Sequence, residues 1–397
     1  MKERIEVFQL EGSEYDMGKK QGEYYQNSIH QMHQQLTHSE EFLAAKPFLI
    51  PKFLFIKLAN LFSSKMIENP IKDNLPSQWT FLEGLSEGAN ISISKLLFLQ
   101  AIDALGTQIS NYKNSENDSF SINNCSAVGV VGKRTNTGKP LIIKNWDGPS
   151  TLANHIIFRR LKPGNNKKYR TLSSGVGGLA GINNGINEKG LAIVYNYAYP
   201  LEIGKEGIPP MFIIREMLEN CSSVKEAAKL LVEFPRLGGA NIMIADKTGD
   251  LAVVEMSPTW FKLRRKGKNG EKDFLICTNH YISSQMREIE VPRNAVYTEE
   301  APEYLQGKPV HKSSIFRYKN AYDILRKTHN QISLDFLNEK IQSNHGPENK
   351  PSEYTFCNHG EQISTGFGVM IDIKNNEFYA TYGKPCQGNM QNLSTLI

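Results

Sequence analysis

Long hydrophobic runs are missing from this 397-residue sequence. The most apolar stretch, residues 48–62, is interrupted by Pro51, Lys52 and Lys57, so it is too short and too charged to cross a membrane. The first residues also lack the uninterrupted apolar segment of a signal peptide, and we therefore expect a cytoplasmic location. The 48–62 stretch is expected to form a helix that covers a ligand pocket, belongs to the core, or joins copies of the chain in a homo-oligomer.

A large charge imbalance is missing too. The net charge of +5 is too small to indicate a nucleic-acid partner. The charge is divided unevenly, because residues 1–124 carry 11 Lys and Arg against 15 Asp and Glu, whereas the remainder carries 35 against 26. The basic second part would favour anionic ligands such as carboxylates or phosphates, or it serves solubility alone.

Cysteine is scarce, and its spacing indicates neither a metal nor a cofactor. No CxxC pair and no Cys/His spacing of the zinc-binding kind occurs, so no metal is expected. An odd, sparse set of thiols is typical of a reducing compartment. The glycine-rich run 175–190 lacks the GxGxxG pattern between a strand and a helix, which excludes a dinucleotide cofactor. The five cysteines are Cys125, Cys221, Cys277, Cys357 and Cys386.

The order of the expected elements indicates an α+β protein. Helical patterns dominate residues 1–124, and short strand-like runs separated by turn signals begin at residue 125. Strands, two helices, strands, helices and strands then follow, which is not an alternation of strand and helix. Two antiparallel sheets packed together and covered by helices on both sides fit this order, with a division between residues 1–124 and a catalytic part, 125–397. The expected helices span residues 14–46, 51–67, 76–90, 94–108, 209–220, 223–234, 314–328 and 333–343.

One cysteine, Cys125, stands where the sequence changes character. The polar, Asn- and Ser-rich segment 111–124 precedes it and is expected to be an exposed loop that can be cut without breaking a core. A strand-like run follows Cys125, and the next such run ends in KNWD, residues 144–147. This order is what an enzyme needs when it cuts its own chain in front of a cysteine and then uses that residue as a nucleophile.

Self-cleavage would give Cys125 its own base. A thiol has a reference pKa of about 8.5, whereas a free α-amino group, with a pKa of about 8, can take the thiol proton. The Cys125 sulfur would attack the Asn124 carbonyl, and water would open the resulting thioester. We expect Asp147 to bind the new ammonium group and Lys144 to hold the thiolate or a substrate carboxylate. Asn241 is expected to donate its NH₂ group to the oxyanion, an interaction typically worth about 2.7–4 kcal/mol of barrier.

Other assignments are open at this stage. A single cysteine is most often a small buried hydrophobe, and Asp147 and Asn241 taken alone would be turn or strand-edge residues. His280, in the run CTNHY, could be the base of a Cys125/His280 pair that needs no cleavage, or a residue that contacts substrate. His359 is a second histidine of this kind. If the chain is never cut, the protein could instead be a non-catalytic binding protein.

An ordered set of motifs resembles the acyl-coenzyme A:6-aminopenicillanic acid acyltransferase (isopenicillin N acyltransferase) family of cysteine N-terminal nucleophile hydrolases. The resemblance runs nearly from end to end and begins with the EGSEYDMGKKQG segment at residues 11–22. The later motifs are Cys125-Ser126, KNWD at 144–147, GLAGINNGINEKGLA at 178–192, NIMIADKTGDLAVVE at 241–255, TNHY at 278–281, SSIFRYKNAYDIL at 313–325 and YGKPC at 382–386.

The resemblance implies the four-layer αββα fold of N-terminal nucleophile hydrolases and self-cleavage between Asn124 and Cys125. It implies Cys125 as nucleophile, Asp147 as its partner, Asn241 as oxyanion donor, and Arg317, in SIFRYKN, as a residue that binds a substrate carboxylate. The expected activity is hydrolysis of a non-peptide or side-chain amide in a small acyl-amide substrate. Transfer of an acyl group from acyl-coenzyme A or an amide donor to an amine is the alternative.

Overall fold

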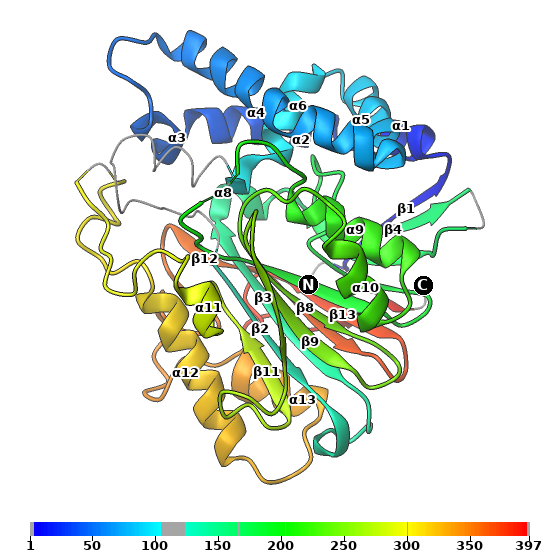
Figure 1. The fold of residues 1–397 in the computed structure, drawn as a ribbon, viewed down its shortest axis with the longest axis vertical. Coiled ribbons are helices and arrows are strands. Elements are labelled where there is room, and N and C mark those ends of the chain that lie inside the picture. Colours follow the sequence, from blue (N-terminus) through cyan, green and yellow to red (C-terminus); the bar gives the residue numbers. More distant parts are fainter. Residues whose placement is uncertain (1–3, 105–123, 165–166, 203, 300, 395–397) are drawn as a thin grey trace.

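The computed structural model describes residues 4–104, 124–164, 167–202, 204–299 and 301–394. Two β-sheets lie face to face at its centre, and helices cover the outer face of each sheet (Figure 1). The expected α+β class and the four-layer αββα arrangement are therefore confirmed. Of the segment expected to form a loop at 111–124, only Asn124 lies within the described residues.

The first sheet has eight strands. Among the described strands its neighbours run antiparallel except for β1, which runs parallel to β4. This pair corrects the expectation of two wholly antiparallel sheets. A parallel pair needs a long crossover connection, and the chain between these two strands supplies one that contains the amino-terminal helices. In spatial order the strands are β1 (Val7–Gly12), β4 (Ile156–Pro163), β5 (Thr171–Val176), β6 (Asn184–Asn187), β7 (Ala192–Tyr197), β8 (Ala240–Ala245), β9 (Leu251–Met256) and β10 (Phe261–Arg265).

The second sheet has six strands and carries Cys125. Two of its interior strands, β2 and β3, pair antiparallel in a register that runs from Asn124 opposite Asp147 to Val130 opposite Leu141. This register fixes which side chains of the expected site share a face. In spatial order the strands are β11 (Phe274–Cys277), β2 (Asn124–Val130), β3 (Leu141–Pro149), β12 (Ile363–Asp372), β13 (Glu377–Tyr382) and β14 (Gln391–Asn392).

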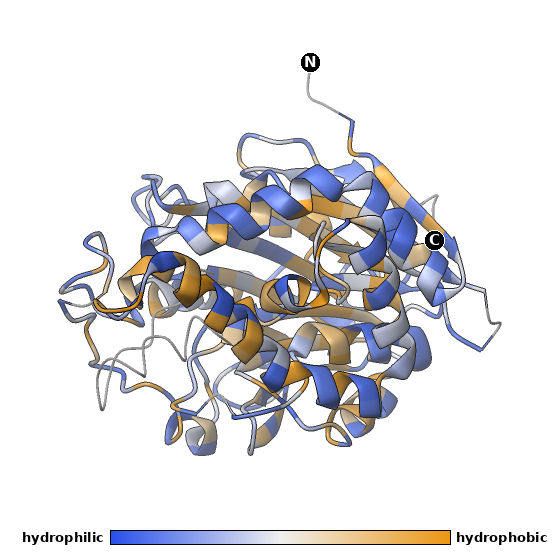
Figure 2. Ribbon diagram, turned by 90° about the horizontal axis from the view of Figure 1, so that it is seen from above, coloured by the Kyte–Doolittle hydropathy of each residue, from blue (hydrophilic) through white to orange (hydrophobic). Residues whose placement is uncertain are grey.

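Alternation along β2 separates two hydrophobic cores, because successive side chains of a strand point to opposite faces. Cys125 and Ala127 join the core between the sheets, whereas Val128 and Val130 join a second core beneath α12 and α13. Helices α9 and α10 pack on the first sheet. The long helices carry hydrophobic and hydrophilic residues side by side (Figure 2), as amphipathic helices do. The helices and short turns after residue 124 are η1 (Gly132–Arg134), α8 (Ser150–Ala153), α9 (Pro210–Asn220), α10 (Val224–Leu231), α11 (Ser284–Arg287), α12 (Lys312–Lys327), α13 (Leu334–Leu337) and η2 (Asn338–Gln342).

The amino-terminal helices differ from the expected ones in their ends. The helix expected at 14–46 is three helices, because Tyr25 and Ser39 leave helical geometry and the Ser39 side chain accepts a hydrogen bond from the Phe42 N–H to cap the third. The helix expected at 51–67 continues to Asn74 and includes Pro70, whose ring is buried with the helix face. The bounds are α1 (Glu14–Tyr24), α2 (Gln26–His38), α3 (Glu40–Ala44), α4 (Lys52–Asn74), α5 (Pro76–Gly88) and α6 (Ile93–Gln100).

Helices α1 and α5 touch through glycines. A Cβ atom added to Gly18 would overlap the carbonyl oxygen of Phe81, and one added to Gly84 would overlap that of Tyr15. Gly22 and Gly88 repeat the pattern one turn along each helix. The absence of these side chains therefore lets the two backbones meet, which explains the spacing of glycines in the EGSEYDMGKKQG segment.

The surface of α4 and the preceding turn is apolar and exposed. Phe48 is 95% exposed and Phe53 75% exposed, and the other members of this surface are Leu49, Leu54, Leu58, Leu61 and Phe62. Phe55, Ile56 and Ala59 of the same stretch pack against the main hydrophobic core, so the segment is partly core, and no residue of 48–62 lines the cavity in front of Asn124 or the cavity beside Trp146. The role in a homo-oligomer stays a prediction. No helix in the described ranges is long and apolar enough to span a membrane.

We predict that Gly84→Ala destabilises the fold. The added methyl group would force α1 away from α5, and such overpacking typically costs about 1–3 kcal/mol, partly offset by the better helix propensity of alanine. Chemical denaturation of the intact Cys125→Ala chain with and without Gly84→Ala measures the difference. Glu83→Ala, an exposed neighbour on the same helix, should shift the unfolding free energy by less than about 0.5 kcal/mol. Equal stability of the two variants would contradict the packing argument.

Candidate active site

Cys125 is the second residue of β2 and is almost fully buried, at 2% exposure. Its main chain is held from both sides. The Cys125 N–H donates a hydrogen bond to Oδ1 of Asn279 at 3.0 Å, and its carbonyl oxygen accepts one from Arg317 at 2.5 Å. The nitrogen of the peptide bond between Asn124 and Cys125 is therefore held in place by the side-chain amide of Asn279.

Arg317 reaches this point from α12 and uses all its N–H groups on the protein. The Nε group donates to Ser313 at 3.1 Å, and one terminal nitrogen donates to Ser126 as well as to the Cys125 carbonyl. The other donates to Asn279 at 2.8 Å and, at 3.5 Å, to Oδ1 of Asn124. Burial lowers the pKa of Arg317, and the negative charge of the nearby Asp147 opposes that shift.

Asp147 lies opposite Asn124 in the β2–β3 pair and is fully buried. The Thr365 hydroxyl donates to its Oδ1 at 2.7 Å, while Oδ2 has no hydrogen-bond partner among the described residues. Thr365 reaches this position because a β-bulge inserts Gly366 into β12. Burial raises the pKa of Asp147 to about 6, against the opposing charge of Arg317. An unpartnered carboxylate oxygen in so buried a place is suited to receive a cation.

Lys144 lies on the inner face of β3, as does Trp146, the residue opposite Cys125. Lys144 is also fully buried. Its ammonium group donates to Oδ1 of Asn196 at 2.5 Å and to the Tyr195 carbonyl on the facing sheet. Burial raises the pKa of the Cys125 thiol, and the charge of Lys144 and its hydrogen bond to the thiol oppose this. Lys144 thus sets a positive charge beside the sulfur and links the two sheets.

The Asn241 NH₂ group and Nδ1 of His280 are engaged elsewhere, whereas Oδ1 of Asn241 is buried without a hydrogen-bond partner among the described residues. The Asn241 NH₂ group donates to the carbonyl oxygens of Thr278 and His280, at 3.1 and 3.2 Å. Nδ1 of His280 lies 2.7 Å from the Ser314 hydroxyl, and burial lowers the pKa of His280 well below its usual range. No hydrogen bond joins His280 to Cys125 within the described residues, which gives no geometric support to a Cys125/His280 pair.

Three further residues belong to this site and were not assigned a role from the sequence. Asn279 binds the nitrogen of Cys125, and Thr365 binds Asp147. Asn358 lies near the Asp147 carboxyl group and, as a donor, opposes the rise of its pKa, although its buried NH₂ group forms no well-aligned hydrogen bond among the described residues. The TNHY motif already contained Asn279, but nothing in the local sequence marks Asn358 or Thr365, because only the fold brings them to β3.

A cavity of about 350 Å³ opens in front of Asn124. Asn124 lines this cavity, whereas Cys125 is not among its lining residues. One wall combines Asn358 and His359, and another carries aromatic rings and Ser313, the residue that binds Arg317. The aromatic members are Tyr199, Tyr297, Tyr304 and Tyr354.

Residues 134–383 match the family model described as acyl-coenzyme A:6-aminopenicillanic acid acyl-transferase. The chain belongs to this family. The matched segment contains Lys144, Asp147, Asn241 and Arg317 and begins after Cys125. The resemblance seen in the motifs is confirmed, and the family is one of amide hydrolases and acyltransferases with the N-terminal nucleophile fold.

Solved structures of other proteins also match this chain, at low sequence identity. A mutant conjugated bile acid hydrolase from Clostridium perfringens is 16% identical, with a TM-score of 0.43, and the match covers 68% of this chain and 93% of that one. A penicillin V acylase from Agrobacterium tumefaciens is 15% identical, with a TM-score of 0.40 and coverage of 68% and 86%. A Caenorhabditis elegans N-acylethanolamine-hydrolyzing acid amidase orthologue is 13% identical, with a TM-score of 0.39 and coverage of 63% and 93%.

The raised pKa of Asp147 predicts a pH dependence of stability in the intact chain. An unfolded aspartate releases its proton near pH 3.9, whereas the folded one keeps it until about pH 6. Because folded Asp147 binds more protons in this interval, its contribution to stability should fall as pH rises from about 4 to 6 and then level off, a loss of about 3 kcal/mol at most. Buried histidines such as His280, whose pKa is lowered, contribute in the opposite direction, so the difference between Cys125→Ala with and without Asp147→Asn measures the Asp147 part.

Asp147→Asn on the same Cys125→Ala background should remove this part of the pH profile and leave the intact chain more stable at pH 7. Asp73→Asn, at an exposed position of α4, serves as the matched control and should keep the profile. A profile for Asp147→Asn that still falls between pH 4 and 6 would mean that another group titrates there.

Proposed function

We propose that this protein is a self-processing cysteine amide hydrolase that acts on a non-peptide or side-chain amide bond through an acyl-Cys125 thioester. The observation that carries the proposal is the position of Cys125. Its nitrogen and carbonyl oxygen are each fixed by a side chain, its sulfur lies beside a buried lysine, and the residue before it, Asn124, lines a cavity. The family described above adds independent support.

The first step is cleavage of the chain. The Cys125 sulfur attacks the Asn124 carbonyl carbon, the peptide nitrogen leaves with a proton as the amine of Cys125, and water hydrolyses the thioester to restore the thiol. The products are residues 1–124 and 125–397, the division expected from the sequence. They would stay together, because β1 of the first chain pairs with β4 of the second.

Cleavage would create a free ammonium group on Cys125 and free an N–H group of Arg317 close to it. The Asp147 Oδ2 atom, which lacks a partner in the intact chain, receives the new ammonium group of Cys125, and Arg317 loses its contact with Asn124. That freed N–H group faces the substrate and suits a carboxylate or a carbonyl oxygen. The intact form would be inactive on substrate, because Cys125 is buried and has no free α-amine to act as its base.

In turnover the α-amine takes the thiol proton, the sulfur attacks the substrate carbonyl, and the leaving amine departs with that proton. Water then hydrolyses the acyl thioester. Lys144 stabilises the thiolate, and Asn241 is one candidate for the oxyanion donor, although it must release a backbone carbonyl to act. Asn358 is a second candidate, because it lines the cavity and its NH₂ group, although near Asp147, forms no well-aligned hydrogen bond in the described residues.

Acyl transfer is the second candidate activity, and the matching family, an acyl-transferase family by description, favours it. The two activities share the acyl-Cys125 thioester and differ in what attacks it. An amine held in the cavity would give transfer, and water would give hydrolysis.

Self-cleavage predicts two masses. Purified protein measured under denaturing conditions should give fragments that meet between Asn124 and Cys125, and Cys125→Ala should give one full-length mass. Cys277→Ala, at another buried cysteine of the same sheet, should be cleaved like the parent protein. A full-length mass for all three would leave no free amine at Cys125, and the binding protein would become the better explanation.

The rate of hydrolysis of N-acyl amides by variants should show which side-chain amide donates a hydrogen bond to the oxyanion. On the processed fraction of each variant, loss of one donor should lower kcat about 10²–10³-fold, as for other oxyanion donors. We expect this for Asn358→Ala and a smaller loss for Asn241→Ala, whose NH₂ group is already engaged. The opposite order would return the role to Asn241. Adding an amine acceptor and measuring acylated amine against free acid separates transfer from hydrolysis.

A further inference from the structure

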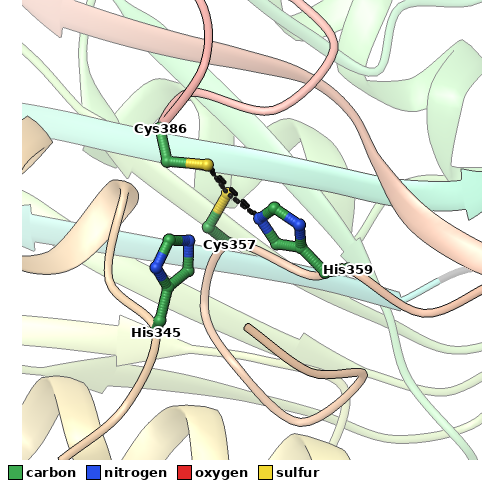
Figure 3. A group of neighbouring side chains, drawn as sticks. All are labelled: His345, Cys357, His359 and Cys386. Carbon is green, nitrogen blue, oxygen red and sulfur yellow. Dashed lines mark hydrogen bonds between the residues drawn. The ribbon is translucent and has the colours of Figure 1, made fainter. Parts of the chain in front are cut away.

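Four metal-binding side chains meet beside the cavity, although they are far apart in the sequence. His345 follows η2, Cys357 and His359 precede β12, and Cys386 follows β13. Figure 3 shows the four side chains pointing toward one another, with the Cys357 sulfur next to both Cys386 and His359. Their ligand atoms all lie within 4.8 Å of one another.

The distances fit the edges of a tetrahedron around a metal ion. The two sulfur atoms are 3.5 Å apart, and Nε2 of His359 lies 3.6 Å from the sulfur of Cys357 and 3.3 Å from that of Cys386. Zn–S bonds of about 2.3 Å and Zn–N bonds of about 2.0–2.1 Å give tetrahedral edges of about 3.8 Å between sulfurs and about 3.6 Å between sulfur and nitrogen. The ligand atoms of Cys357, His359 and Cys386 are therefore spaced within about 0.3 Å of the separations that a bound ion requires.

His345 provides a second, independent observation. Its Nε2 atom is buried and has no hydrogen-bond partner among the described residues, and its ring meets the His359 ring edge to face at 4.9 Å between centroids. A buried imidazole nitrogen is normally paired, so this one needs a partner. A metal ion among the four side chains would supply it.

We propose that His345, Cys357, His359 and Cys386 bind one Zn²⁺ ion. Two thiolates and two imidazoles are a typical ligand set for structural zinc, and four protein ligands leave no open position for a substrate. Binding converts two thiols to thiolates and releases two protons, so the ion and its ligands together carry no net charge. The site is distinct from Cys125, and none of its four ligands has a role in the proposed acyl chemistry.

The ion would position the wall of the cavity. Asn358 lies between the two ligands Cys357 and His359 in the sequence. Its backbone N–H donates a hydrogen bond to the Thr365 hydroxyl, which itself donates to Asp147. Backbone carbonyls next to the cluster are bound by Asn145 of β3. Zinc would thus fasten the loop that carries Asn358 to the end of β13 through Cys386. Asn358 does not bind the ion in this arrangement, but the ion holds the loop that places Asn358 at the cavity.

A disulfide between Cys357 and Cys386 is the competing use of the same pair. The sulfur separation of 3.5 Å is larger than the bond length of about 2.05 Å, but a small movement would close it. The two uses exclude one another, because a disulfide leaves no thiolate for the metal. The thiol count and the metal content therefore distinguish them.

The test measures metal and thiols in the full chain, purified in reducing buffer, incubated with ZnCl₂ and freed of excess metal. We expect about one Zn²⁺ per chain, falling to background in Cys357→Ala, Cys386→Ala and His345→Gln. Cys221→Ala, at a buried cysteine outside the cluster, should keep the metal. Chelation of the parent protein should lower its Tm, while Cys386→Ala should show no such shift.

Replacing zinc by Co²⁺ keeps the proposal testable if the variants fail to fold. The metal-free parent protein should then develop the visible bands of tetrahedral cobalt and the thiolate charge-transfer bands of cysteine ligands. No bound zinc and no cobalt bands in folded protein would overturn the proposal. A disulfide would be established instead by a metal-free parent protein with three free thiols rather than five. Cys386→Ala, which cannot form this disulfide, should then have four free thiols, one more than the parent.

Discussion

The arrangement around Cys125 depends on the guanidinium group of Arg317. This group is the common partner of β2, of the loop that carries Asn279, and of α12, so three parts of the second sheet and its helix layer meet on one planar cation. A lysine could not replace it, because five donors in a rigid fork are needed to reach all these acceptors. Its burial carries a desolvation cost that the dense hydrogen bonding offsets.

A second constraint is the division of charge between the two faces of the second sheet. Asp147 and Arg317 lie on the face toward α12, whereas Lys144 lies between the sheets beside the sulfur of Cys125. The strand period of two produces this division, because Asp147 and Lys144 are three residues apart and must point in opposite directions. One strand thereby places an anion near the nitrogen of Cys125 and a cation near its sulfur.

Much of the fold and part of the site could be predicted from the sequence. The strand runs after residue 125 and the KNWD segment placed Cys125, Lys144 and Asp147 on neighbouring strands, because strand periodicity and turn residues are local signals. The parallel β1–β4 pair, the bulge at Gly366 and the cluster of His345 with Cys386 depend on contacts between distant segments. Asn358 and Thr365 were missed for the same reason, since no local pattern marks a residue that acts through the fold.

The register of β2 has a consequence for how the protein could be assembled. The ladder with β3 begins at Asn124, so a break in front of Cys125 lies at the very end of the strand and leaves the pairs from Cys125 to Val130 in place. The folded form would be almost unchanged by the break. Refolding would change completely, because β1 and the amino-terminal helices would then be on a separate chain from β4. A unimolecular reaction would become bimolecular and dependent on concentration, so the protein would fold best before it is cut.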